Sequence, residues 1–222
     1  MSLTISTIAK NLVNLVYPLH CASCGKALDP LDESGVCSFC RTKIRPNPKS
    51  HVASSGFDRA YSACLYEETL KELIHTFKYK RRISLSKLFA HLLTDFINVN
   101  PEIAEKSDLI TFVPLHNSRL RAREFNQSKL LASKISDSFK IPLVDTLDKT
   151  RMTRNQNELS RNERLVNLSG AFRIRRNTNL TGKSVLLVDD VMTTGATLDE
   201  CAKALKDSGA IEVRCLTLAR VV

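Results

Sequence analysis

The sequence predicts an α/β protein in which a mostly parallel sheet is flanked by helices, with a small zinc-binding domain at the N-terminus. Short apolar runs typical of buried strands alternate with stretches of helical periodicity, which is the pattern of a parallel sheet. The 222 residues are 43% hydrophobic, enough for one substantial core and a small appendage. Two Cys-x-x-Cys pairs lie close together near the N-terminus. We therefore expect two domains, residues 1–50 and residues 51–222.

Helices and strands can be assigned in order along the chain. The first 17 residues have the apolar spacing of an amphipathic helix, and two prolines within residues 45–49 indicate a linker. Short apolar runs predict strands at 57–66, 108–113, 142–144, 185–188 and 211–219. Apolar residues that recur every three or four positions predict helices at 68–79, 83–97, 126–139 and from Ala196 to a C-cap at Gly209. The polar stretch 148–164 carries no predicted element.

One predicted strand is followed by residues suited to holding a phosphate. In VLLVDDVMTTGATLDE, residues 185–200, the strand leads into two acids, a turn of threonines and a glycine, and then a helix. Ligands bind at the carboxyl ends of strands in open α/β sheets, and a helix N-terminus offers free backbone N–H groups. Thr193, Thr194 and Thr197 add hydroxyl donors around the conformationally free Gly195. The turn therefore predicts a phosphate cup, against the alternative of a simple helix cap.

The two acids predict the other half of the ligand. Carboxylates accept hydrogen bonds and repel phosphate, so Asp189 and Asp190 suit sugar hydroxyls or a hydrated cation. A ligand with a phosphate at one end and a diol a few ångströms away satisfies both halves of the motif. Ribose 5-phosphate has this shape.

These residues resemble a known family. VLLVDDVMTTGAT resembles the 5-phosphoribosyl-1-pyrophosphate (PRPP) motif of the type I phosphoribosyltransferases. Together with VPLHNSRLRAREFNQSKLLA at 113–132, RNQNELSRNERLVNLSGAF at 154–172 and the four N-terminal cysteines, it is similar to the ComF-type competence proteins over nearly the whole chain. The resemblance implies the type I phosphoribosyltransferase fold for the larger domain. Glu124 departs from it, because glycine is expected before Phe-Asn-Gln.

The resemblance also implies a site for PRPP and Mg²⁺. The two acids would be catalytic, because they would hold the ribose hydroxyls and stabilise the positive charge that develops on the sugar. Residues 113–123 would form a pyrophosphate loop beside the Mg²⁺, and residues 149–164 hold the place of a closing loop. The implied PRPP-binding residues are Asp189, Asp190, Val191, Met192, Thr193, Thr194, Gly195, Ala196 and Thr197. The implied pyrophosphate-loop residues are Leu115, His116 and Arg119.

The sequence does not identify a second substrate. Purine-salvage members of the superfamily have an aspartate where this chain has Thr193, and that acid handles a proton on the base. His116 has the chemistry of a general acid or base, but a histidine beside such a loop also serves to position residues or to contact phosphate. Catalysis therefore stays open.

The N-terminal cysteines have the spacing of a structural zinc site. Two Cys-x-x-Cys turns separated by twelve residues can close a tetrahedron of thiolates, which leaves no position for water or substrate. A redox-active dithiol is the alternative, although it needs only one pair. The predicted zinc ligands are Cys21, Cys24, Cys37 and Cys40. The other cysteines lie among apolar neighbours and are expected in the core: Cys64, Cys201 and Cys215.

The positive charge is concentrated in the middle of the chain. Residues 71–183 hold 22 Lys and Arg against 11 Asp and Glu, whereas the whole chain has a net charge of +10. Pyrophosphate, a nucleic-acid backbone and a merely solvated surface are three explanations. Candidate pyrophosphate cations are Arg119, Arg121, Arg123, Arg151 and Arg154. Candidate nucleic-acid contacts surround Tyr79, as single-strand binding favours: Lys78, Lys80, Arg81 and Arg82.

Three functions follow from these expectations. The first is a PRPP-binding protein of DNA uptake that contacts single-stranded DNA or a translocase or helicase of the uptake machinery. The second is a phosphoribosyltransferase acting on an unidentified nitrogen nucleophile, and the third a PRPP-sensing regulator without catalysis. No apolar run approaches the length of about 18 residues that a membrane span needs. With no export signal in the N-terminal segment, we expect a cytoplasmic protein.

Overall fold

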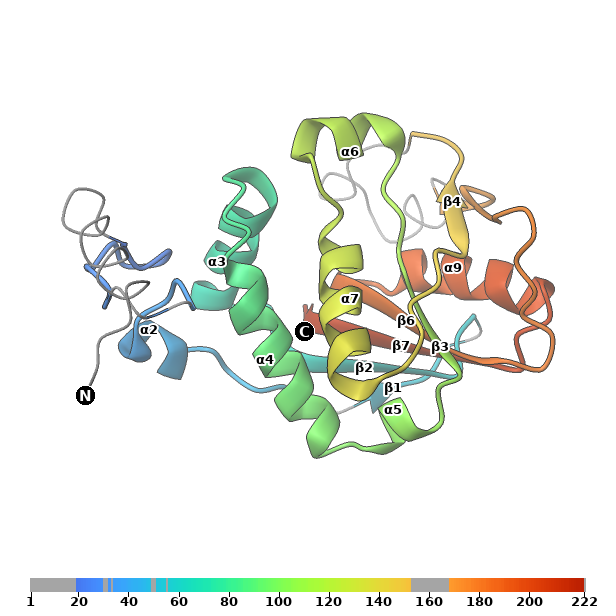
Figure 1. The fold of residues 1–222 in the computed structure, drawn as a ribbon, viewed down its shortest axis with the longest axis horizontal. Coiled ribbons are helices and arrows are strands. Elements are labelled where there is room, and N and C mark those ends of the chain that lie inside the picture. Colours follow the sequence, from blue (N-terminus) through green and yellow to red (C-terminus); the bar gives the residue numbers. More distant parts are fainter. Residues whose placement is uncertain are drawn as a thin grey trace, which may run out of the picture.

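The protein is built around one twisted sheet with helices on both faces (Figure 1). The computed structural model describes residues 19–29, 32, 34–48, 51–54, 56–152 and 168–221. The predicted N-terminal helix and residues 153–164 of the polar stretch lie outside the described residues. No helix in the described ranges is long and apolar enough to cross a membrane.

The main sheet has five strands in the order β1-β2-β7-β6-β3, and its four longer strands are parallel. Only β1 runs antiparallel to its neighbour β2. The mostly parallel sheet predicted from the alternating pattern is therefore confirmed. The strands are β1 (His51–Val52), β2 (Arg59–Leu65), β3 (Leu109–Phe112), β6 (Ser184–Met192) and β7 (Glu212–Arg220).

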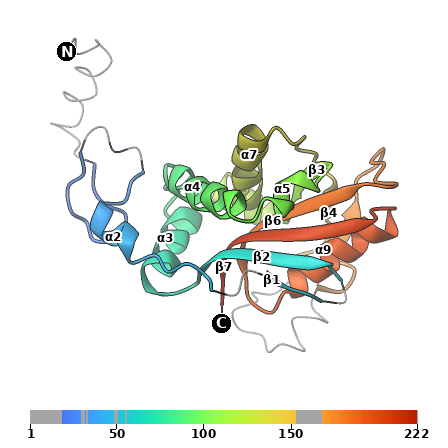
Figure 2. The ribbon, with the colours of Figure 1, turned by 90° about the horizontal axis from the view of Figure 1, so that it is seen from below.

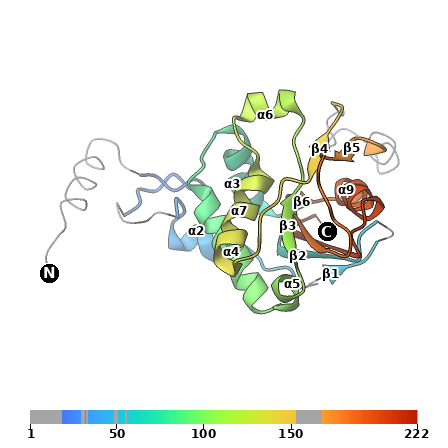
Figure 3. The ribbon, with the colours of Figure 1, turned by 45° about the vertical axis from the view of Figure 1, so that its right-hand side comes forward.

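Apolar helix faces cover the sheet on both sides (Figures 2 and 3). One face carries α3 (Glu68–Tyr79), α4 (Leu85–Asn98) and α7 (Gln127–Phe139), and its core includes Leu73, Phe89 and Ile135 from these helices. The other face carries α9 (Ala196–Asp207), whose Cys201 and Leu205 pack against apolar side chains of β6 and β7. Cys64, Cys201 and Cys215 are buried, as expected.

Three local predictions were wrong. The strand predicted to end at Val188 continues to Met192, so both acids lie on the strand rather than in the turn. Residues 142–144 form only a single parallel bridge, between Leu143 and Ile110 of β3. At the start of the polar stretch, Leu147–Lys149 forms strand β4, which overlaps it and pairs antiparallel with β5 (Phe172–Ile174) in a separate small sheet.

Three short helices of the described residues were not predicted at all. They are α2 (Ser38–Thr42), α5 (Glu102–Glu105) and α6 (Asn117–Arg123). None of the residues of α6 is buried, so its sequence has no apolar stripe that periodicity could detect. It lies above the carboxyl end of the sheet, next to the end of α3 (Figure 1).

The cysteine segment, by which we mean the described residues 19–29, 32 and 34–44, packs against α3 and the loop that follows it. Its helix α2 (Ser38–Thr42) carries Cys40, and Val36 is fully buried in the same core as α3 and α4. The Arg82 guanidinium Nη2 donates to the His20 carbonyl oxygen over 2.6 Å. Ser23 Oγ donates to a carboxylate oxygen of Glu72 on α3 over 3.1 Å. The segment is therefore joined to the helix layer by apolar and polar contacts.

Candidate functional site

A cavity of about 240 Å³ opens at the carboxyl end of the parallel strands. This is the position at which open α/β sheets bind ligands. The cavity is lined from four directions: the end of β6 and the following turn, the segment from Val113 through α6 to the start of α7, the end of α3, and Lys149 on β4. The lining residues predicted as PRPP-binding are Asp189, Asp190, Val191, Met192, Thr193, Gly195, Ala196 and Thr197. Thr194 is the one member of that predicted set outside the lining.

Asp189 and Asp190 are held in different ways because neighbouring side chains of a strand point to opposite sides. Asp189 Oδ1 accepts hydrogen bonds from Ser128 Oγ over 2.7 Å and from the Asp190 backbone N–H over 2.9 Å. Asp190 is 8% exposed and forms an ion pair with Lys78, whose Nζ lies 2.7 Å from Oδ2 and 2.8 Å from Oδ1. Each acid therefore has a fixed position at the cavity.

The environment of Asp189 also affects its protonation. Burial, and then the adjacent charge of Asp190, raise the pKa of Asp189 to about 7, against the opposing effects of the Ser128 hydrogen bond and the Lys78 charge. A carboxyl group that titrates close to neutral pH inside a cavity is typical of a functional site.

The turn after β6 leads through a glycine cap into helix α9. Gly195 is the N-cap of α9 with φ of 84°, which glycine adopts without strain. The twelve-residue α9 begins at Ala196, so its N-terminus, with free backbone N–H groups, lies at the cavity lined by Thr193, Ala196 and Thr197. Thr194 Oγ1 instead accepts a hydrogen bond from the Ala196 N–H over 3.5 Å. Thr194 therefore stabilises the turn itself.

The predicted pyrophosphate loop is part loop and part helix. Leu115 and Arg119 line the cavity, whereas His116 does not. His116 is the N-cap of α6, and its Nδ1 accepts a hydrogen bond from the Ser118 N–H over 3.3 Å. Burial lowers the pKa of Arg119. His116 therefore caps α6 through its Nδ1, and its role toward a ligand stays a prediction.

The backbone at Glu124 explains why glycine was expected there. Glu124 ends α6 with φ of 66°, in the left-handed region that favours glycine. Its carboxylate forms an exposed ion pair with Arg81 over 2.7 Å. The departure from the expected glycine thus changes the side chain at this position without preventing the turn.

Gln127 is a cavity residue that the sequence did not single out. Its side chain is 1% exposed, and its Oε1 accepts a hydrogen bond from Arg123 Nη1 over 3.1 Å. That contact fixes the amide orientation, so Nε2 is the donor, and it is a buried atom without a hydrogen-bond partner among the described residues. A buried unpaired donor at the wall of a cavity calls for an acceptor from a ligand.

Lys149 is the second cavity residue that the sequence missed. It ends β4 and lines the cavity, and its Nζ lies over the Phe172 ring, 5.1 Å from the centroid. Burial, and then the charge of Arg119, lower the pKa of Lys149 to about 8. A strand of three residues gives no sequence signal, so Lys149 could not be assigned to the site by pattern.

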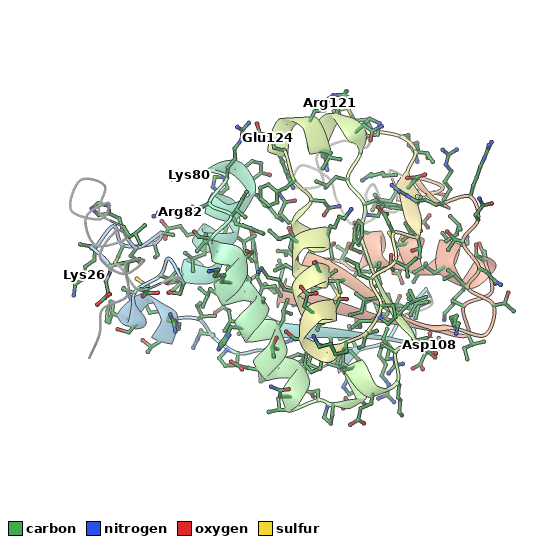
Figure 4. The ribbon with its side chains drawn as sticks, viewed as in Figure 1. Lys26, Lys80, Arg82, Asp108, Arg121 and Glu124 are labelled. Atoms are coloured by element: carbon green, nitrogen blue, oxygen red, sulfur yellow. The ribbon has the colours of Figure 1, made fainter. Side chains whose placement is uncertain are left out.

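The four predicted nucleic-acid residues separate into two groups. Lys78 points into the cavity and pairs with Asp190, so it is not part of the exposed basic surface. Lys80, Arg81 and Arg82 follow the end of α3, where Lys80 and Arg82 project away from the sheet (Figure 4). Arg82 reaches toward the cysteine segment, where it contacts the His20 carbonyl.

The remaining candidate cations do not gather at the cavity. Arg123 lines it, but Arg121 is exposed at the outer end of α6 (Figure 4). Arg151 is exposed and donates to the Ser169 carbonyl over 2.7 Å. Arg154 lies outside the described residues.

The four N-terminal cysteines form one cluster that could hold a metal ion. Their sulfur atoms all lie within 4.8 Å of one another, and Cys24 Sγ is 3.7 Å from Cys37 Sγ. Four thiolates about 2.3 Å from a tetrahedral Zn²⁺ would be about 3.8 Å apart, so the arrangement fits that ion. The backbone N–H of Cys37 donates a hydrogen bond to Cys21 Sγ over 3.4 Å, which links the two Cys-x-x-Cys pairs. The cluster is N-terminal to the cavity and separate from it.

Comparison with known proteins agrees with this architecture. A family described as "Phosphoribosyl transferase domain" matches residues 126–221. Competence protein F of Haemophilus influenzae is 30% identical over 227 residues, which cover 92% of this chain and 98% of that protein. The DNA utilization protein YhgH of Escherichia coli is 30% identical, with 94% of this chain and 100% of that protein covered.

A relative from a third organism is similar over most of the chain as well. Competence protein ComFC of Bacillus subtilis is 29% identical over 205 residues, which cover 90% of this chain and 77% of that protein. These similarities run through both the cysteine cluster and the sheet, and they confirm the resemblance seen in the sequence motifs. The chain therefore belongs to the ComF-type family, and it combines a phosphoribosyl transferase domain of mostly parallel α/β fold with an N-terminal four-cysteine cluster.

Proposed function

We propose that the protein binds Mg-PRPP in the cavity at the end of the sheet and acts in the uptake or handling of DNA. The observation that supports Mg-PRPP as the ligand is the cavity itself, which combines a turn suited to phosphate, two acids and cations from other segments in about 240 Å³. The names of its relatives, competence and DNA utilization proteins, support the DNA role. We further propose that the four cysteines hold structural zinc, because the donor set is all thiolate.

Each part of PRPP has a matching part of the cavity. Asp189 and Asp190 would accept hydrogen bonds from the ribose 2- and 3-hydroxyls, and the turn 193–197 would donate to the 5-phosphate. Arg119 and the backbone at Leu115 would face the pyrophosphate. When bound, Mg²⁺ would neutralise pyrophosphate oxygens, with ligand oxygens, water and the two carboxylates as its suitable donors.

Gln127 and Lys149 complete the proposed pyrophosphate side. The unpaired Nε2 of Gln127 is a neutral donor for one phosphate oxygen, and the Lys149 ammonium is a cation from strand β4. Charge brought by the ligand would favour the protonated amine, because a nearby opposite charge raises the pKa of a lysine.

Calorimetry of the wild-type protein with Mg-PRPP tests the proposal. The variant Gln127→Leu tests the part assigned to the unpaired amide donor. We expect saturable binding by the wild type and a loss of affinity in the variant of about 1.5 to 3 kcal/mol, the usual value of a hydrogen bond to a charged group. The variant should be at least as stable as the wild type, because it removes a buried unpaired donor. A wild-type protein that takes up no Mg-PRPP would refute the ligand assignment.

The affinity for Mg-PRPP should have a maximum between the pKa values of two cavity groups. Raising the pH through about 7 ionises Asp189 and improves it as an acceptor for hydroxyls, so affinity rises. Raising the pH through about 8 deprotonates Lys149 and removes a cation, so affinity falls. Calorimetric titrations from pH 6 to pH 9.5 check both limbs. Outside the maximum, the affinity should change by about ten-fold per pH unit.

Lys149→Arg separates the two limbs of this profile. Arginine keeps its charge over the whole range, so the fall above about pH 8 should disappear while the rise below it remains. An unchanged fall in this variant would show that another group titrates there.

We assign the DNA contact to the cations that follow the end of α3, of which Lys80 and Arg81 are exposed and Arg82 is half-buried. Lys80, Arg81 and Arg82 lie between the cavity and the cysteine cluster, and Arg82 contacts the cluster's His20 carbonyl. A single strand bound along these residues would therefore run past both features. Contacts of this kind go mainly to phosphate and depend strongly on salt.

Removal of these three cations should weaken binding of single-stranded DNA and lower its salt dependence. The slope of the logarithm of affinity against the logarithm of salt should become less negative by about 2, since each phosphate contact contributes about −0.7. Fluorescence anisotropy with a labelled oligonucleotide measures the slope. A control variant with alanine at exposed Lys106, Arg176 and Lys203 loses the same charge elsewhere. Equal slopes in the two variants would show that only the net charge matters.

A further inference from the structure

The turn that follows β6 is supported by a segment that does not reach the cavity. Residues 56–58 lie between β1 and β2, and none of these three lines the cavity. Phe57 is 2% exposed and belongs to one apolar cluster with Met192 and Ala196, which stand on either side of the turn. A Cβ on Gly195 would lie 3.7 Å from the nearest Phe57 ring carbon, so the ring lies against the glycine cap of α9.

Gly56 approaches the first turn of α9 so closely that no side chain fits between them. Its backbone N–H donates to Asp199 Oδ1 over 3.2 Å. A Cβ on Gly56 would lie 2.5 Å from that oxygen and 2.8 Å from the Asp199 Cα, well inside the usual contact distance of about 3.5 to 4.0 Å. The Asp199 backbone N–H in turn donates to the Gly195 carbonyl oxygen over 2.9 Å. Asp199 therefore connects Gly56 to the glycine cap.

Asp58 holds the other end of α9. Its Oδ2 accepts a hydrogen bond from the Val213 N–H of β7 over 2.8 Å and lies 3.0 Å from the Nζ of Lys206. Lys206 is in the last turn of α9, seven residues after Asp199, and residues at this spacing share one face of a helix. The 56–58 segment therefore contacts the same face of α9 near both of its ends.

We propose that the 56–58 segment is a buttress that holds the 193–197 turn in the shape that binds the 5-phosphate, with Phe57 and Asp199 as positioning residues. The inference rests on the proposed function, because it concerns the turn assigned there to a phosphate monoester. Backbone N–H groups bind a phosphate tightly only if their directions converge before the ligand arrives, since ordering a loose turn costs binding free energy. Gly195 alone would leave the turn soft, and the contacts with the buttress restrict it.

The charge of Asp199 offers a way to separate positioning from simple helix stabilisation. A carboxylate in the first turn of a helix stabilises the helix through its dipole, but it repels a bound phosphate. Asp199→Asn removes this charge and keeps an oxygen that can accept the Gly56 N–H, whereas Asp199→Ala removes both. A positioning role predicts that only the alanine variant loses phosphate affinity. A role in the helix dipole alone predicts that the two variants behave alike.

Two fragments of the ligand test the buttress by calorimetry. Ribose 5-phosphate contains the group assigned to the 193–197 turn, and magnesium pyrophosphate contains only the group assigned to the segment around Arg119. The variants are Phe57→Leu, which keeps an apolar side chain, and the two Asp199 variants. The control is Phe89→Leu, which removes the same ring from a fully buried position on α4, on the other face of the sheet.

We expect Phe57→Leu and Asp199→Ala to bind ribose 5-phosphate about 5- to 50-fold more weakly than the wild type, within the usual coupling between residues of one network. Their affinity for magnesium pyrophosphate should stay within about twofold, and Asp199→Asn and Phe89→Leu should bind both fragments as the wild type does. Equal losses for the two fragments, or the same loss in Phe89→Leu, would show general destabilisation and overturn the inference. Ribose 5-phosphate binding that is unchanged in Phe57→Leu and Asp199→Ala would also overturn it.

Hydrogen exchange of the ligand-free protein keeps the test independent of the ligand assignment. The amide of residue 199, which donates to the Gly195 carbonyl, should exchange faster in Phe57→Leu than in the wild type or Phe89→Leu, while the amides of β6 keep their protection. A wild type that binds neither Mg-PRPP nor ribose 5-phosphate would refute the proposed function, and the exchange rates would then decide by themselves whether the segment holds the turn. Faster exchange in neither Phe57→Leu nor Asp199→Ala would refute the buttress and leave the PRPP assignment in place.

Discussion

Replacing Asp189 and Asp190 together by alanine should abolish Mg-PRPP binding while the protein keeps its metal content. Each carboxylate is expected to accept a hydrogen bond from a ribose hydroxyl, and a hydrogen bond to a charged group contributes about 1.5 to 3 kcal/mol. Two such losses amount to at least about a hundredfold in affinity. Calorimetry with Mg-PRPP measures the loss, and elemental analysis measures the metal.

The ion pair between Asp190 and Lys78 complicates the alanine variant, so a second variant is needed. Removing one partner of a fully buried pair costs about 3 to 5 kcal/mol of stability, because the other charge is left unpaired. The Lys78 side chain is 18% exposed, so the cost here should be smaller. Asp189→Asn with Asp190→Asn keeps an acceptor for Lys78 and the shape of both side chains. It should be more stable than the alanine variant and still bind Mg-PRPP at least about tenfold more weakly than the wild type.

The control must remove the same charge away from the cavity. Losing two acids raises the net charge from +10 and by itself favours an anionic ligand. Asp108→Ala with Asp137→Ala makes the same change, and neither residue lines the cavity. Asp108 lies at the far end of the sheet (Figure 4). If the two double variants bound Mg-PRPP equally well, the acids of β6 would not be part of its site.

The part of the candidate site that sequence could predict is the part contained in one short segment. The acids, the glycine turn and the start of α9 at Ala196 follow one another within residues 189–197, so their proximity is guaranteed by the chain. What the motif did not show is that the strand continues to Met192. Two adjacent acids interrupt the apolar run there, and hydrophobicity alone ends the strand too early.

The far wall of the cavity could not be predicted because it depends on how α3 packs against the sheet. Lys78 contacts Asp190 across 112 positions in the sequence. From the sequence, we predicted that Lys78 and its neighbours Lys80, Arg81 and Arg82 share one nucleic-acid-binding surface. The helical period gave a finer signal, because Lys78 is four residues after the buried Ile74 and borders the buried face of α3. The same period places Tyr79 four residues after His75, on the face that lines the cavity.

Short elements without an apolar face were the other source of error. Helix α6 has no buried residue and begins at a histidine cap instead of the commoner Ser, Thr, Asp or Asn. Strand β4 has three residues, of which only Leu147 is buried. Such elements are stabilised by tertiary contacts, and their sequences contain too few apolar positions to show a period. Gln127 and Lys149 were missed for a related reason. Folding brings them to the cavity, and no pattern in the sequence marks them.

Replacing Cys40 by alanine should remove the zinc and unfold the cysteine segment, whereas Cys64→Ala should leave the zinc in place. Cys40 is one of the four clustered thiols, and Cys64 is buried in the sheet away from them. The free energy of binding of structural zinc, about 10 to 16 kcal/mol in isolated fingers, is folding free energy for such a segment. Elemental analysis of reduced protein should give one zinc per chain for the wild type and Cys64→Ala, and less than about a tenth for Cys40→Ala.

Loss of this zinc should also destabilise α3, because the cysteine segment packs against that helix. Val36 and Ile44 are buried in the same core as Leu70 and Leu73 of α3, and Arg82 contacts the His20 carbonyl. The Cys40→Ala protein should therefore melt at a lower temperature than Cys64→Ala, and its α3 amides should exchange hydrogen faster, whereas the amides of β6 and β7 keep their protection. If reduced wild-type protein held less than one zinc per chain and cycled between thiol and disulfide, the cysteines would be a redox pair and not a structural site. Unchanged α3 exchange in Cys40→Ala would show that the cysteine segment folds separately from the sheet.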